Sequence, residues 1–137
     1  MMKSKGNLLH TVEYFTKIHD DFLKEWDLAM LTGDTSKVEI MSDNYFVTFF
    51  NRKDDKPSTF NREEAIDGMH QSVNSLLGAK KRFENRIIRM RNHESFVVFY
   101  ELIIEKESRE LARFFTIENW QYKDKKWEIV RELEEHI

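Results

Sequence analysis

The 137-residue sequence contains no cysteine, one proline and four glycines. The absence of cysteine excludes disulfides, thiolate metal sites and cysteine nucleophiles. The scarcity of proline and glycine excludes collagen-like and flexible-linker architectures. No segment approaches the roughly 20 apolar residues of a membrane-spanning helix, and the N-terminus has no apolar block typical of a signal peptide. We therefore predict a cytoplasmic protein that does not enter a membrane.

Neither sign of charge dominates the chain. The 22 Lys+Arg and 25 Asp+Glu residues give a net charge of −3, which argues against a nucleic-acid-coating protein. Six basic residues do fall within positions 80–91, but cross-strand pairing with glutamates of the last strand explains them. We predict no nucleic-acid partner. The 40% hydrophobic content supports one packed domain over residues 1–137, with 1–7 disordered.

The first half of the chain has helical periodicity. Apolar residues recur every three or four positions up to Gly33, which provides a left-handed helix end; they are Leu8, Val12, Phe15, Ile18, Phe22, Trp26 and Ala29. A short second helix capped by Asp34 or Thr35 is expected to bury Val38 and Met41. Asn61 and Glu64 match a capping box that begins a third helix, which ends at Gly78.

The period then changes to that of strands. After one strand at 45–50 and a loop at 51–58, four strands are predicted at 81–91, 95–106, 111–122 and 127 to the end. Short polar connectors between the last four indicate antiparallel hairpins. The predicted fold class is α+β: a curved, mostly antiparallel sheet that forms a cone capped by three N-terminal helices. Such a concave surface is a usual place for a small-molecule site.

Two short motifs resemble a known family. The sequence Trp26-x-x-Ala29-x-x-x-Gly33-Asp34 is followed by Val38, Met41 and Tyr45, and the chain closes on Trp120 and the run 127–130. These residues resemble the nuclear transport factor 2-like (SnoaL-like, cystatin-like) superfamily. The resemblance implies a cone-shaped fold, frequent homodimers, and a pocket that serves isomerase, dehydratase, cyclase or hydrolase chemistry in some members and binding or assembly in others.

The resemblance also weakens one kind of chemistry. Many relatives have a histidine six residues after the last-strand tryptophan, and Leu133 takes that position here. Histidine-based catalysis at that place is therefore not expected.

Strand alternation predicts the ligand-binding residues. Trp127, Ile129, Arg131 and Leu133 share one face of the last strand, and its apolar members place that face inside the cone. Arg113 and Arg131 would then clamp a carboxylate or phosphate. The alternative is that each arginine pairs with a local glutamate such as Glu101 or Glu118. The predicted binding set is Trp26, Tyr45, Glu101, Arg113, Asn119 and Arg131.

Two residues are candidates for acid–base catalysis. His19 borders the apolar stripe of the first helix and would act as a base near neutral pH; packing with a hydrogen bond is the alternative. Asp27, beside Trp26, would act as a base if dehydrated, although an aspartate there is more often solvated. No HExxH, GxSxG, P-loop or GxGxxG motif exists, and we predict no metal and no cofactor.

The function predicted from these observations is binding of a small acidic or ring-containing molecule in the cone. An acid–base isomerase, dehydratase or cyclase is one alternative, and a non-catalytic homodimerisation module is another. The two central strands are apolar on both faces, and three helices cannot cover both sides of a sheet. A homodimer through the convex sheet face is therefore expected.

Overall fold

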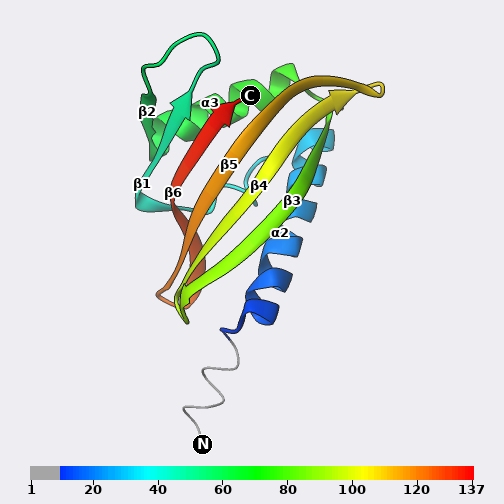
Figure 1. Ribbon diagram of the computed structural model, residues 1–137. Coiled ribbons are helices and arrows are strands. Elements are labelled where there is room, and N and C mark those ends of the chain that lie inside the picture. Colours follow the sequence, from blue (N-terminus) through cyan, green and yellow to red (C-terminus); the bar gives the residue numbers. More distant parts are fainter. Residues whose placement is uncertain (1–9) are drawn as a thin grey trace, which may run out of the picture.

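The computed structural model describes residues 10–137, and the predicted disorder at 1–7 lies outside them. Two helices and one six-stranded sheet make up this part of the chain. In order they are α2 (Val12–Thr32), β1 (Met41–Phe50), β2 (Ser58–Asn61), α3 (Arg62–Ser75), β3 (Lys80–Asn92), β4 (Ser95–Lys106), β5 (Arg109–Lys123) and β6 (Lys126–His136). The strand order is β2-β1-β6-β5-β4-β3 (Figure 1).

The predicted α+β class is confirmed. In the described part of the chain, only the β1–β6 pair is parallel, and every other neighbouring pair of strands is antiparallel. Strands β3 to β6 hold 11 to 15 residues each, and strands of this length accumulate twist. The sheet therefore bends, and both helices lie on its concave side (Figure 1).

The first helix follows the predicted stripe. The Thr11 hydroxyl caps its start by accepting a hydrogen bond from the Tyr14 amide, and Gly33 ends it with a φ of 84°. A residue with a side chain strains in that left-handed conformation, so glycine is required there. The buried face holds Phe15, His19, Phe22, Ala29 and Met30; Leu8 lies outside the described residues. Neither helix in residues 10–137 combines the length and apolar composition that a membrane crossing requires.

The predicted second helix is wrong. Residues 36–38 form a single turn, closed by the Val38 amide on the Thr35 carbonyl at 3.0 Å. The Ile40 carbonyl then accepts from the Ile129 amide at 2.9 Å, which draws the segment into the sheet one residue later, at Met41. Pairing with β6 therefore overrides a weak local helix signal. Val38 and Met41 are buried as expected, but from a turn and a strand.

The third predicted helix is confirmed as α3, including its capping box. The Asn61 side chain accepts from the Glu64 amide, and the Glu64 side chain accepts from the Asn61 amide, both at 2.9 Å. Strand β2, just before it, was not predicted. All four of its residues are exposed at the edge of the sheet, so no hydrophobic alternation marks it.

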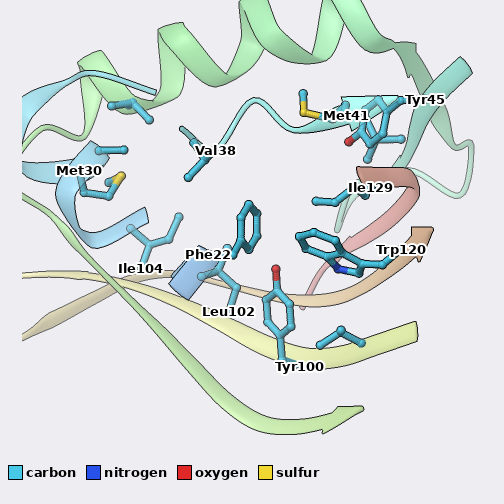
Figure 2. Close-up of a cluster of buried hydrophobic side chains, with 14 of the residues drawn as sticks. Phe22, Met30, Val38, Met41, Tyr45, Tyr100, Leu102, Ile104, Trp120 and Ile129 are labelled. Atoms are coloured by element: carbon cyan, nitrogen blue, oxygen red, sulfur yellow. The ribbon is translucent and has the colours of Figure 1, made fainter. Parts of the chain in front are cut away.

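The four predicted hairpin strands are confirmed within one or two residues. The β4–β5 and β5–β6 connections use Glu107–Ser108 and Asp124–Lys125, all at positive φ. Two successive positive-φ residues match the twist of the flanking strands and close a tight hairpin. The core lies between the concave face and the helices: α2 packs along β3, and α3 packs against β1 and β2. Figure 2 shows this core, with Phe22 of α2 and Tyr100 and Trp120 of the sheet in one cluster.

Candidate functional site

A cavity of about 300 Å³ lies between the concave sheet face and the two helices. Helix α3 contributes Gly68, Met69 and Ser72 to the wall of the cavity, and α2 contributes Phe22 and Trp26. Apolar and aromatic side chains from five strands form most of the remainder. The polar lining consists of Tyr45, Ser72, Lys81, Tyr100, Glu118, Glu132 and Glu134. The cavity is therefore largely apolar but carries several ionisable groups, as small-molecule sites do.

Glu118 is the most buried charged residue at this cavity, with 1% of its side chain exposed. Its Oε1 accepts hydrogen bonds from His19 Nε2 at 2.8 Å and from Trp120 Nε1 at 2.9 Å, and its Oε2 accepts from the Tyr100 hydroxyl at 2.5 Å. These three bonds satisfy the oxygens of the buried carboxyl group and fix its position between α2, β4 and β5.

His19 links this carboxylate to the surface. Arg86 NH1 donates to His19 Nδ1 at 3.0 Å, so Nδ1 accepts and Nε2 carries the hydrogen that Glu118 receives. Arg86 also forms an ion pair with Asp20 at 2.8 Å. A bulge in β3 turns Arg86 toward α2, with Asn85 at a φ of 57°. Arg86 thereby fixes the His19 tautomer that donates to Glu118.

Two further glutamates of β6 face the cavity. The Tyr45 hydroxyl donates to Glu132 Oε1 at 2.7 Å. Burial, together with the negative charges of Glu118 and Glu134, raises the pKa of Glu132 well above its usual range. Burial also raises the pKa of Glu134, and Lys81 opposes that rise. The inner wall thus holds Glu118 in a closed set of hydrogen bonds and two carboxyl groups that retain protons more readily than usual.

Among residues 10–137, Lys81 is the one basic side chain that lines the cavity. Its Nζ lies 3.4 Å from the centroid of the Trp26 ring, in a cation–π position. Burial lowers the pKa of Lys81 to about 8, although Glu134 and Glu132 act in the opposite direction. A substantial fraction of this amine is therefore neutral near physiological pH.

No protein-family model matches the sequence, and no curated protein matches it. Solved structures do. A cystatin-like protein of unknown function from Nostoc punctiforme aligns with a TM-score of 0.70 at 14% identity, over 93% of each chain. A nuclear transport factor 2-like protein from Cytophaga hutchinsonii aligns at 0.63 and 19% identity, over 89% of this chain and 98% of the other. A protein from Parabacteroides distasonis, described as a candidate ketosteroid isomerase, aligns at 0.58 and 11% identity, over 83% of each.

The chain has the nuclear transport factor 2-like fold. The resemblance inferred from Trp26, Gly33 and the Trp120–Val130 region is therefore confirmed as a structural one. Identities of 11% to 19% establish the fold and carry no substrate or activity with them.

Within this nuclear transport factor 2-like cone, the predicted binding residues separate into two groups. Trp26 and Tyr45 line the cavity. Glu101 and Arg113 lie on the opposite, convex face, where Arg113 NH1 pairs with Glu101 Oε1 at 3.0 Å and NH2 pairs with Glu110 at 3.0 Å. The predicted inward position of Arg113 and Glu101 is wrong, and the alternative, pairing with a local glutamate, holds for Arg113.

Asn119 and Arg131 were also expected inside and lie on the convex face. They are direct cross-strand partners. Asn119 accepts a hydrogen bond from Arg91 NH1 at 2.7 Å, and the Arg131 guanidinium lies 4.9 Å from the Phe46 ring centroid. The predicted arginine clamp therefore does not exist inside the cavity.

Glu101, Arg113 and Asn119 were placed on the wrong face because both faces of β4 and β5 carry apolar residues, so alternation does not show which face is inside. The error at Arg131 comes from a single extra residue in β6. Trp120 pairs with Ile129, but Asn119 pairs with Arg131, so Val130 is a bulge. Alternation is correct up to Ile129 and reverses after it. Glu132 and Glu134 consequently point into the cavity, and Arg131 and Leu133 point away from it. The acidic inner wall follows directly from this bulge.

The two predicted catalytic candidates differ in position. His19 is fully buried and bonded to Glu118 beside the cavity, without lining it. Asp27 is exposed on α2 and does not line the cavity. No group of three histidine, aspartate or glutamate side chains within residues 10–137 is placed to hold a metal ion.

Sequence analysis did not assign Lys81, Tyr100, Glu118, Glu132 or Glu134 to the site. Tyr100 shares a strand face with Phe96, Val98, Leu102 and Ile104, so its inward direction was readable. The charged residues gave no such signal, because a charged residue in a strand is normally solvated. Only the strand register places them inside.

Proposed function

We propose that the protein binds a small, ring-containing molecule in the cone cavity, and that this ligand is neutral or cationic. The observation that carries the proposal is the position of Glu118, Glu132 and Glu134 on the inner wall of an otherwise apolar cavity. An acidic ligand would meet these carboxyl groups without an arginine to balance them, since Arg113 and Arg131 face outward. The acidic class is therefore dropped from the predicted ligands.

The remaining lining favours a ring. Trp26, Phe22, Phe83, Phe114 and Tyr100 supply aromatic surfaces around the space, and aromatic pairs favour stacked or edge-on contacts. A volume of about 300 Å³ lies at the lower end for small-molecule sites. One or two rings with a hydrogen-bond donor directed at Glu132 or Tyr45 fit this size and chemistry.

Thermal shift with three matched probes tests the proposal. Benzylamine and benzyl alcohol should raise the melting temperature, and benzoate should not, because selective binding to the folded state stabilises it. Gly68→Leu provides a blocked cavity: Gly68 lines the cavity, and a Cβ added there meets nothing within 4 Å. This variant should lose both responses, and Gly68→Ala should keep them. A response to benzoate alone, or an unchanged response in Gly68→Leu, would overturn the proposal.

Acid–base catalysis is a second candidate function, and the Tyr45–Glu132 pair favours it. A carboxyl group whose pKa is raised well above its usual range is suited to exchange protons with a bound substrate, and one structural neighbour is described as a candidate ketosteroid isomerase. Deuterium exchange into the α-positions of cyclohexanone, followed by NMR, should be faster with wild type than with Glu132→Gln. Glu101→Gln, on the convex face, is the matched control. Equal rates in all three proteins would exclude this candidate.

We also propose that a second copy of the chain covers the convex face. The residues Ile87, Phe99, Ile117 and Leu133 are consecutive cross-strand partners, so they form one apolar row across four strands. The row on one side contains Arg89, Asn119 and Arg131, and the row on the other contains Glu101 and Glu135. A twofold axis through the apolar row places the arginines of one copy over the glutamates of the other.

Sedimentation tests this dimer. Ile87 on the convex face and Leu31 on α2 are both strongly exposed, at 62% and 68%. Wild type and Leu31→Asp should sediment as dimers at micromolar concentration, and Ile87→Asp as a monomer. A monomeric wild type would disprove the dimer without affecting the cavity. The cytoplasmic location stays a prediction.

A further inference from the structure

Lys81 occupies an unusual position for a lysine. Its side chain leaves β3 toward the cavity and places Nζ 3.4 Å from the Trp26 ring centroid. Although three glutamates share the cavity, Lys81 forms no ion pair of 4.0 Å or shorter within residues 10–137. Its neighbour Lys80 is exposed and points to the other face of the same strand. Lys81 is thus an amine held against an aromatic wall with open space beside it.

We propose that Lys81 is a nucleophile that captures a ring-containing aldehyde or ketone in the cavity as an imine. This inference rests on the proposed function, because the carbonyl compound must first bind there. Lysines used for imine chemistry are those whose amine is neutral, desolvated and adjacent to a proton donor. Each of these conditions has a counterpart around Lys81.

The neutral amine is favoured by the surroundings as a whole. Ionisable groups facing Lys81 are Glu132 and Glu134 of β6, Glu118 of β5, Tyr45 of β1 and Tyr100 of β4. The helices contribute only uncharged side chains to the lining. The carboxylates favour the ammonium form, but burial outweighs them and brings the pKa of Lys81 to about 8. At pH 7.5 the neutral fraction is then more than a hundredfold that of an ordinary lysine.

Glu132 supplies the proton transfers that imine formation needs. The Lys81 nitrogen bonds to the carbonyl carbon, and the π electrons of the C=O bond move to oxygen, which takes the Glu132 proton. The nitrogen then returns a proton to Glu132. This proton next goes to the hydroxyl group, which leaves as water as the C=N bond forms, and loss of the last N–H proton restores the Glu132 carboxyl. Amine and carbonyl give imine and water, with no change of oxidation state.

Reductive trapping tests the inference. The protein is incubated with benzaldehyde and sodium cyanoborohydride at pH 7.5, and labelled lysines are mapped by mass spectrometry. Lys81 should be labelled at least about tenfold faster than Lys80, with a pH profile that rises toward pH 8. Glu132→Gln should slow labelling at Lys81 and leave Lys80 unchanged. Gly68→Leu should remove the preference, and Gly68→Ala should keep it.

Labelling of Lys81 no faster than Lys80 would overturn the inference. Benzyl alcohol separates this failure from failure of the proposed function, because it has the ring but no carbonyl. A melting-temperature rise with benzyl alcohol, without preferential labelling by benzaldehyde, would retain the binding site and reject the nucleophile. No response to either compound would reject both.

Discussion

Glu118 illustrates how a single residue sets the properties of the cavity. Transfer of a carboxylate into a protein interior is costly unless its oxygens are fully hydrogen-bonded. His19, Trp120 and Tyr100 each donate one bond to it. The retained negative charge then acts on its neighbours: it is among the causes that raise the pKa values of Glu132 and Tyr100. A buried structural charge thus keeps protons on the groups that face the ligand space.

Glu118→Gln tests this arrangement. An amide presents one acceptor and one donor group, so its NH₂ must face either the Tyr100 hydroxyl or the His19 and Trp120 N–H groups. We expect the free energy of unfolding, from urea denaturation, to fall by about 2 kcal/mol. Glu101→Gln, in a partly exposed ion pair, should cost below about 1 kcal/mol. Equal stability of Glu118→Gln and wild type would show that the Tyr100 hydroxyl turns and accepts a hydrogen bond from the new amide.

At the scale of elements, local patterns were sufficient for most of the fold. The stripe of α2, the capping box of α3 and the alternation of β3 to β6 each arise within a dozen residues, so the sequence predicts them directly. Strand β2 and the turn at 36–38 depend on pairing with distant strands. No local signal determines them.

The site was predicted less well because it depends on register. Trp26 and Tyr45 were assigned to the cavity correctly, because a large ring beside apolar residues points toward the core whichever register β6 adopts. Glu101, Arg113 and Asn119 lie on strands with two apolar faces, so alternation alone does not select the inner one. Arg131 required the phase of β6 beyond Val130, and nothing in the residues 127–134 marks a bulge there. The glutamates after it have the appearance of a solvated face. An error of one residue in register therefore exchanged an acidic wall for a basic one.

Helix α3 covers the cavity, and its capping box should determine how firmly it does so. Asn61→Ala removes the acceptor for the Glu64 amide and leaves a helix-end N–H group without its partner. We expect a loss of about 1 kcal/mol in the free energy of unfolding and faster amide hydrogen exchange in the first turn of α3. Asn61→Asp, which keeps the acceptor, should behave as wild type. Unchanged exchange in Asn61→Ala would mean that packing against β1 alone fixes this helix end.

At the scale of the whole molecule, the two faces of the sheet carry opposite electrostatic designs. On the convex face, arginines pair with glutamates. Arg113 lowers the pKa of Glu110, and Asn85 together with Arg113 lowers the pKa of Glu101. The concave face gathers carboxyl groups whose pKa values are raised. These groups make opposite contributions to the pH dependence of stability.

The free energy of unfolding should therefore have its maximum near pH ~5 and fall toward pH 8. Glu132 and Glu134 each have a folded-state pKa above the unfolded value. At a pH between these two values, the folded protein holds a proton that the unfolded chain has released. Raising the pH through that interval removes stability. Glu101 and Glu110 have lowered pKa values, and their stabilisation is lost only as the pH falls below the ordinary carboxyl range. Lys81 gives a constant penalty until the pH exceeds about 8.

Urea denaturation of wild type and Glu132→Gln from pH 5 to pH 8 checks this assignment. The variant cannot ionise at position 132, so its stability should fall less steeply, and the difference between the two proteins should grow with pH in favour of the variant. The free energy of unfolding of Glu101→Gln should instead run parallel to that of wild type from pH 5 to pH 8, because the lowered pKa of Glu101 affects stability only at lower pH. Parallel curves for wild type and Glu132→Gln would place Glu132 in water as an ordinary carboxylate. The acidic cavity wall would then offer no proton to a bound carbonyl, and Lys81 would have to act without it.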